Sequence, residues 1–222
     1  YQSWMWKRHA GMDVVTYNGQ NSAFDLPHSL NAVPEMIWFK SRSNDLFWYV
    51  YHKGLNGGTN PEQYSLTLNS SAAETNQGSP GQILSLTSTH VGLNYWSGAV
   101  SQNSYTYIAM LFASTDVSAV GSYTGNATDS DHSSGTNTIS FGFQPRMVII
   151  KTADANGEWV IFDTLRGWAS GSGNTKRLRL NLTNAQNNEN FGYPTSTGMI
   201  LTGSGSGLTN YSGQNYIYYA HS

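Results

Sequence analysis

The stretch Pro34-Glu35-Met36-Ile37-Trp38-Phe39-Lys40 returns, with conservative changes, as Pro145-Arg146-Met147-Val148-Ile149-Ile150-Lys151, at an offset of 111 in the numbering. A second block has the same offset, since Trp48-Tyr49-Val50-Tyr51-His52 matches Trp159-Val160-Ile161-Phe162-Asp163. Self-similarity at a fixed period is the sequence signature of a repeated structural unit. These four stretches therefore predict that the chain contains one unit twice.

Two more blocks extend the repeat toward its end. Leu66–Asn69 matches Leu178–Asn181 at an offset of 112, and Tyr105–Ala109 matches Tyr216–Ala220 at 111. All the blocks come in the same order at nearly one offset. The 222 residues thus correspond to two periods of a unit of about 111 residues.

Short segments of alternating or apolar residues, separated by turn-forming clusters, fill each unit. No window shows a helical stripe longer than two turns. About seven strands per unit predict an all-β fold of two tandem, duplicated, jelly-roll-like β-sandwich units. We expect the strands at Ser3–Lys7, Met12–Tyr17, Glu35–Ser41, Phe47–His52, Tyr64–Asn69, Ile83–Leu86, Tyr105–Ala113, Val117–Tyr123, Asn137–Phe141, Arg146–Thr152, Glu158–Asp163, Arg177–Asn181, Gly198–Thr202 and Asn215–Ala220.

The domain boundaries follow from the start of the chain. Tyr1 lies as far before the Tyr-x-Gly turn at Tyr17 as Tyr107 lies before the similar turn at Tyr123, so Tyr1–Lys7 corresponds to the closing strand of a unit. We therefore predict that residues 1–11 are the closing strand of a preceding unit plus a linker. Residues 12–116 are then the first β-sandwich repeat and residues 117–222 the second.

The strand around Trp48 carries apolar side chains on both faces. Trp48 and Val50 share one face, while Phe47 and Tyr49 share the other, because successive strand residues point in opposite directions. Such a strand is typical of a central position covered on both sides, or of a subunit contact. Trp48 and its counterpart Trp159 are interpreted as two equivalent core tryptophans.

Composition removes several functional classes. Only 11% of the residues are charged, the net charge is −2 and there is no cysteine, while 13% are aromatic. A near-neutral chain lacks the basic footprint of a nucleic-acid-binding protein, and without cysteine there is neither a disulfide scaffold nor a thiolate metal site. No apolar run is long enough to cross a membrane as a helix. The remaining composition is typical of extracellular β-rich proteins and viral fibres.

Catalytic and metal-binding patterns are sparse. Among the 13 acidic residues, the closest cluster lies in Asp129-Ser130-Asp131-His132. This segment is interpreted as a solvated insertion rather than a cation site. The histidines show no metal-ligand spacing. Asn69 and Asn181 begin Asn-x-Ser/Thr sequences at equivalent strand ends and are interpreted as turn residues. The chain is accordingly predicted to be no enzyme and to need no cofactor or metal.

Aromatic residues in polar loops leave binding as the remaining function. Flat rings stack on the apolar faces of sugars, and neighbouring amides bond sugar hydroxyls. Tyr95, Trp96, Trp168 and Tyr211 are the candidate ligand-binding residues, and Tyr95-Trp96 and Tyr211 both precede a Ser-Gly pair before a closing strand. The alternative is that these rings pack under their own loops or into a subunit interface.

The blocks Val14–Gly19, Val33–Lys40, Trp48–Asn56 and Gly142–Lys151 resemble a tandem β-domain of large structural proteins from marine bacteriophages, including cyanophages. That domain occurs in tail-fibre and other virion-associated proteins. The resemblance covers nearly the whole chain and implies an extracellular location on a virion surface. It brings no catalytic motif.

These observations predict a viral structural or fibre module that binds a host-surface glycan and other copies of itself or neighbouring virion proteins. The alternative is a purely architectural subunit of an extracellular filament, assembled through strand or edge pairing. A polysaccharide depolymerase is the weaker third hypothesis, because acids and catalytic motifs are few.

Overall fold

The computed structural model describes residues 5–95, 99–128, 135–170, 175–189, 191–203 and 208–222. The fold is all-β, as predicted. Its described helices are three short 3-10 turns: η1 (Leu55–Gly58), η2 (Pro61–Gln63) and η3 (Thr164–Arg166). None of the helices in these ranges could span a membrane.

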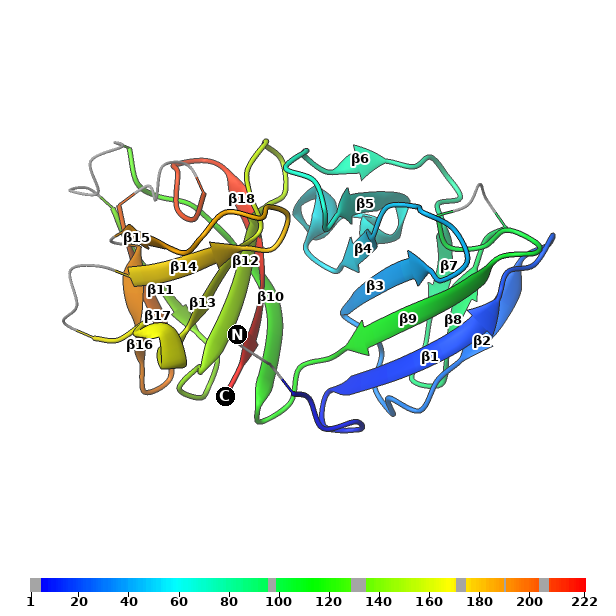
Figure 1. The fold of residues 1–222 in the computed structure, drawn as a ribbon, viewed down its shortest axis with the longest axis horizontal. Coiled ribbons are helices and arrows are strands. Elements are labelled where there is room, and N and C mark those ends of the chain that lie inside the picture. The colour runs from blue at the N-terminus through cyan, green and yellow to red at the C-terminus, as the bar shows by residue number, and fades with distance from the viewer. Residues whose placement is uncertain (1–4, 96–98, 129–134, 171–174, 190, 204–207) are drawn as a thin grey trace.

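The first repeat is a sandwich of one large and one small antiparallel sheet (Figure 1). The large sheet has the order β1-β9-β3-β4-β5-β6 and the small sheet the order β2-β8-β7. Their strands are β1 (Met12–Asn18), β2 (Phe24–Pro27), β3 (Met36–Ser41), β4 (Tyr49–His52), β5 (Tyr64–Thr67), β6 (Thr75–Asn76), β7 (Ile83–Leu86), β8 (His90–Leu93) and β9 (Thr106–Phe112).

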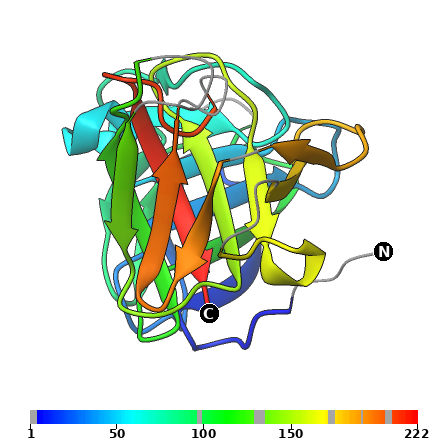
Figure 2. The same ribbon diagram turned by 90° about the vertical axis from the view of Figure 1, so that its left-hand side faces the viewer.

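The second repeat has the same topology. Its large sheet runs β10-β18-β12-β13-β14-β15 and its small sheet β11-β17-β16, in the half that faces the viewer in Figure 2. Each strand thus has a counterpart in the first repeat. The strands are β10 (Ser118–Thr124), β11 (Thr136–Ser140), β12 (Met147–Thr152), β13 (Val160–Asp163), β14 (Thr175–Arg179), β15 (Asn187–Glu189), β16 (Gly192–Thr195), β17 (Gly198–Thr202) and β18 (Asn215–His221). The predicted duplication of a sandwich unit is confirmed.

The duplicated stretches Pro34–Lys40 and Pro145–Lys151 each form a strand that is covered on both faces. In β3, Ile37 and Phe39 belong to the core between the large and small sheets, whereas Met36 and Trp38 belong to a separate core. The counterpart β12 divides in the same way, with Val148 and Ile150 facing one core and the alternate residues facing the other. Because residues alternate across a strand, a strand between two cores is apolar throughout.

The second face of each large sheet packs against the other repeat. One core contains Trp38, Val50 and Phe112 from the first half together with Ile149 and Trp159 from the second. The two large sheets thus form the middle of a four-layer stack with a small sheet on either outside (Figure 1). The two units form one body.

Hydrogen bonds join the halves along one side of this core. Trp159 Nε1 donates to the Thr67 carbonyl at 3.0 Å. Glu74 N donates to the Ala153 carbonyl at 2.7 Å, and Gly157 N donates to the Ser71 carbonyl at 2.8 Å. These bonds hold the segment after β5 against the turn between β12 and β13.

The closing strands are equivalent at an offset different from the predicted one. Tyr17 stacks on Tyr107 with centroids 5.2 Å apart, and Tyr123 stacks on Tyr216 at the same distance. The hydroxyls of Tyr17 and Tyr123 each donate to a main-chain carbonyl just before the closing strand. Tyr107 therefore corresponds to Tyr216, which makes the offset 109, and the predicted offset of 111 is wrong for this block. A slip by two positions keeps every side chain on the same face, so the pattern alone could not detect it.

Five short strands were not predicted from the sequence patterns: β2, β6, β8, β15 and β16. Each has two to four residues, and β2 and β16 contain a proline. Four of the five lie at the edge of a sheet, where little alternation is needed. The predicted strand Ser3–Lys7 has no strand in its described part, residues 5–7, and its assignment to a preceding unit stays a prediction.

His52 is buried at the junction of the halves. Its Nε2 donates to the Tyr218 carbonyl of β18 at 3.2 Å, while its Nδ1 accepts from Gly54 N at 2.9 Å. Burial lowers the pKa of His52 from 6.5 to about 4, the Tyr218 carbonyl opposes that shift, and the charges of Lys53 and Glu35 act in opposite directions. The neutral ring is therefore the form that joins the two sheets.

Acidification should weaken the fold through this histidine. Between pH 6.5 and about 4 the unfolded chain binds a proton that folded His52 does not, so stability is full above this window and declines as the pH falls through it. The loss is at most about 3 kcal/mol. Urea unfolding from pH 7 to 4 should give a flatter pH dependence for His52→Gln than for the wild type, and identical slopes would contradict the assignment.

Candidate functional site

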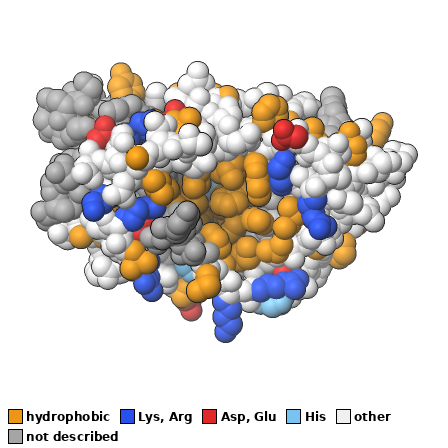
Figure 3. Space-filling view, viewed as in Figure 1, with side chains coloured by type: hydrophobic (Ala, Val, Ile, Leu, Met, Phe, Trp, Pro, Cys, Tyr) orange, Lys and Arg blue, Asp and Glu red, His pale blue; other side chains and the backbone are white. Residues whose placement is uncertain are grey.

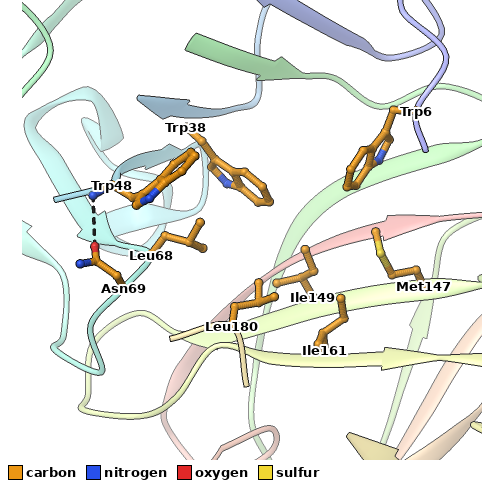
Figure 4. Close-up of a pocket in the computed structure, with 9 residues that line it drawn as sticks. All are labelled: Trp6, Trp38, Trp48, Leu68, Asn69, Met147, Ile149, Ile161 and Leu180. Carbon is orange, nitrogen blue, oxygen red and sulfur yellow. Dashed lines mark hydrogen bonds between the residues drawn. The ribbon is translucent and has the colours of Figure 1, made fainter. Parts of the chain in front are cut away.

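An open apolar groove lies between the two large sheets (Figure 3). Its volume is about 310 Å³, at the lower end of the range for small-ligand pockets. We call it the central groove, and its lining is shown in Figure 4: Trp6, Trp38, Trp48, Leu68, Asn69, Met147, Ile149, Ile161 and Leu180.

Both repeats contribute equivalent positions to the groove. Trp38 on β3 is matched by Ile149 on β12, and Leu68 after β5 is matched by Leu180 after β14. Figure 4 shows Trp38 and Trp48 on one wall, with Ile149 and Leu180 on the wall opposite. The groove is thus the part of the interface between the halves that the chain's described side chains leave open.

The two repeat tryptophans behave differently. Trp159 is 1% exposed and belongs to the core between the halves, which confirms its interpretation as a core residue. Trp48 is only partly buried and lines the groove, so the predicted equivalence with Trp159 is wrong in this respect. The sequence signal was the aromatic character of both strand faces around Trp48, which also fitted a contact surface.

An asparagine fixes the backbone at each of these tryptophans. Asn69 Oδ1 accepts from Trp48 N at 3.1 Å, and Asn181 Oδ1 accepts from Trp159 N at 3.1 Å. The repeated Leu-x-Leu-Asn ending therefore ties the loop after β5 or β14 to the start of the neighbouring strand. This agrees with the interpretation of both asparagines as turn residues.

Polar chemistry in the groove is scarce. None of its nine lining residues has an ionisable side chain, and Asn69 is its one polar non-aromatic member. Trp6 Nε1 donates to the Tyr219 hydroxyl at 2.9 Å, and burial raises the pKa of Tyr219. Trp38 Nε1 is buried without a hydrogen-bond partner among the described residues. The described lining is therefore apolar and contains no side chain that could act as an acid or a base in catalysis.

The predicted sugar-binding residues are not brought together. Tyr95 is 58% exposed after β8 in the first half, and Tyr211 is 44% exposed in the second. Trp168 is 1% exposed, stacks on Phe162 and donates from Nε1 to the Gly192 carbonyl. Its ring therefore offers no free face, as in the alternative of packing under its own loop. Trp96 lies outside the described residues.

Tyr211 and the Tyr95-Trp96 pair do not occupy equivalent repeat positions. Gly19 approaches the Gln102 backbone and Gly125 approaches the Tyr211 backbone, so at the structural offset of 109 Tyr211 corresponds to Gln102. The cluster Asp129–His132 falls outside the described residues. Within the part of the chain that is described, no three metal-ligating side chains gather.

Comparison with known proteins gives one match. A family model with the description "Domain of unknown function (DUF7483)" matches residues 5–222. Neither a search of curated proteins nor a search of solved structures finds a match.

Proposed function

We propose, from the premise that the chain belongs to the family of unknown function DUF7483, that it is a non-enzymatic structural module of an extracellular, virion-associated appendage such as a tail fibre. The observation that carries the proposal is the central groove, an open apolar contact surface without an ionisable side chain. Apolar surface of this kind marks a place where another molecule binds.

The body around the groove supports a mechanical role. Two sandwiches share a core across the large sheets, so the chain forms one block rather than two loosely linked units. Two ion pairs, Arg166 with Asp163 and Arg177 with Glu189, hold charged side chains of the second half in place, while the buried Lys151 donates to main-chain carbonyls. The virion context rests on the resemblance of the repeated blocks to phage structural domains.

Immunogold electron microscopy tests the proposal directly. An antibody raised against the purified chain should label the tail fibres or another appendage of virions whose genome encodes it. Pre-absorption of the antibody with the chain is the control and should abolish labelling. Intact virions that carry no label, with the protein found only in infected-cell lysate, would overturn the structural role.

Glycan attachment is a second candidate function, favoured by the exposed rings of Tyr95 and Tyr211. A glycan array probed with the wild type, Tyr95→Ala and Tyr211→Ala would detect it. Phe47→Ala, which removes an exposed ring at another place, is the matched control. Loss of signal in a tyrosine variant alone would support this candidate, and a blank array for the wild type would remove it. A reducing-end assay on host polysaccharide tests the depolymerase hypothesis in parallel.

A further inference from the structure

We infer that the central groove is a docking site for an apolar side chain, above all an aromatic one, carried by an extended peptide segment of a neighbouring protein chain. This inference rests on the proposed function, because it names the kind of contact through which the module would join its neighbours.

The groove continues an interface that is already built from such contacts. Trp159 is buried where the halves meet, and Leu180 N donates to the Trp159 carbonyl at 2.9 Å. Ile161 lies two residues after Trp159, Leu180 lies beside Trp159 just after the neighbouring strand β14, and both line the groove. The filled and the open parts of the interface are therefore one continuous surface.

The part of the interface that Trp159 occupies shows which kind of contact this surface makes. Trp159 packs in the core shared by both large sheets, and its Nε1 donates to the carbonyl of Thr67. Its partner is thus the end of an extended segment, which offers apolar side chains and a main-chain carbonyl that also accepts from Ser70 N at 3.2 Å. The next residue, Leu68, already lies in the groove. Trp48, the repeat counterpart of Trp159, forms no corresponding bond among the described residues and faces open space instead.

A second observation is the buried N–H of Trp38. An unpaired donor in an apolar environment costs about 1–3 kcal/mol, and Trp38 Nε1 has no acceptor within the described ranges. Because this atom is buried, a main-chain carbonyl of a bound segment could accept its bond only after the Trp38 ring turned toward the groove. The same segment would place its apolar side chain between the indoles and the side chains of Ile149 and Leu180 on the opposite wall (Figure 4).

The rim of the groove favours a peptide over a sugar. Met5 is exposed next to the lining residue Trp6, and Leu182 is exposed two positions after the lining residue Leu180. The apolar lining therefore continues into exposed apolar residues. A sugar would lose the hydration of several hydroxyls against a lining without ionisable groups, which is unfavourable without replacement hydrogen bonds.

The test uses N-acetyl-L-tryptophanamide, a neutral indole flanked by two amide carbonyls, as the probe. N-acetylglycinamide lacks the ring and N-acetylglucosamine presents a sugar, so the three probes separate an aromatic peptide from its alternatives. The chain has 7 tryptophans, and their indole N–H signals can be followed by NMR during titration and assigned with Trp→Phe variants. We expect saturable shifts of the Trp38 and Trp48 indole signals with the tryptophan probe.

Variants connect these shifts to the groove. Trp48→Ala should raise the dissociation constant of the tryptophan probe about tenfold, as expected for the loss of a central aromatic contact, whereas Phe47→Ala should leave it unchanged. Leu180→Ala replaces Trp48→Ala if circular dichroism shows that the latter is not native. No shift at the groove indoles, equal loss in Phe47→Ala, or equal affinity for N-acetylglucosamine would overturn the inference. If the antibody labels virions but the tryptophan probe does not bind, the docking site is excluded while the proposed structural role stands.

Discussion

Trp159→Ala is expected to lower the free energy of unfolding by about 4 kcal/mol, whereas Trp48→Ala at the equivalent repeat position should lower it by only about 1 kcal/mol. The reason is the different burial of the two indoles. Trp159 lies in the core between the halves and donates to the Thr67 carbonyl, so its removal leaves a cavity and takes away one of the hydrogen bonds that this carbonyl accepts. Trp48 lies at an open groove that water can fill.

Equilibrium unfolding in urea, followed by circular dichroism, measures both variants under one condition. Since the two substitutions remove the same atoms from matched positions, each serves as the control for the other. Equal losses would mean that the halves bury both tryptophans alike, and the groove would then not exist in solution.

Asp163→Asn should cost about 3 kcal/mol, because it removes the carboxylate from a largely buried guanidinium while keeping the helix cap. Asp163 Oδ1 accepts from Arg166 N at 2.9 Å, and its Oδ2 lies 2.5 Å from Arg166 Nη2. The first repeat has no ion pair at the equivalent positions. It places His52 and the fully buried Leu55 where the second has Asp163 and Arg166.

The double variant Asp163→Asn, Arg166→Leu removes both charges and places a leucine where the first repeat has Leu55. We expect it to recover most of the loss, since replacing both members of a buried ion pair is often nearly neutral. Arg166→Leu alone should also destabilise, and a double-mutant cycle gives the coupling between the two residues. Additive losses in the double variant would show that the ion pair is not buried as a unit.

The central groove could not be predicted from the hydrophobic pattern of the sequence. The sequence places apolar residues on both faces of the strands containing Trp38 and Ile149, and this is enough to predict that both faces are covered. It cannot say what covers them, because a second repeat, a second chain and a ligand all satisfy the same alternation. Leu68 and Leu180 similarly look like ordinary strand residues until the two sheets are placed face to face.

The candidate sugar-binding residues show that the sequence does not determine whether an aromatic ring in a loop is exposed. Loop position and ring type pointed to Trp168, yet its ring is stacked on Phe162 in the core of the second half. A ring in a polar loop can turn inward whenever the loop spans a core, and its exposure depends on contacts distant in sequence. Tyr95 and Tyr211 are exposed but belong to different halves.

The sequence by itself determined the all-β class, the duplication and the positions of the long strands, because period-two alternation and turn residues are local properties that each unit carries twice. Only the tertiary structure decided that the two large sheets face each other, that Tyr107 in one closing strand corresponds to Tyr216 in the other, and that Trp159 is buried while Trp48 is not. Packing between distant surfaces makes these decisions, and two copies of one pattern can occupy different environments once they share a single interface.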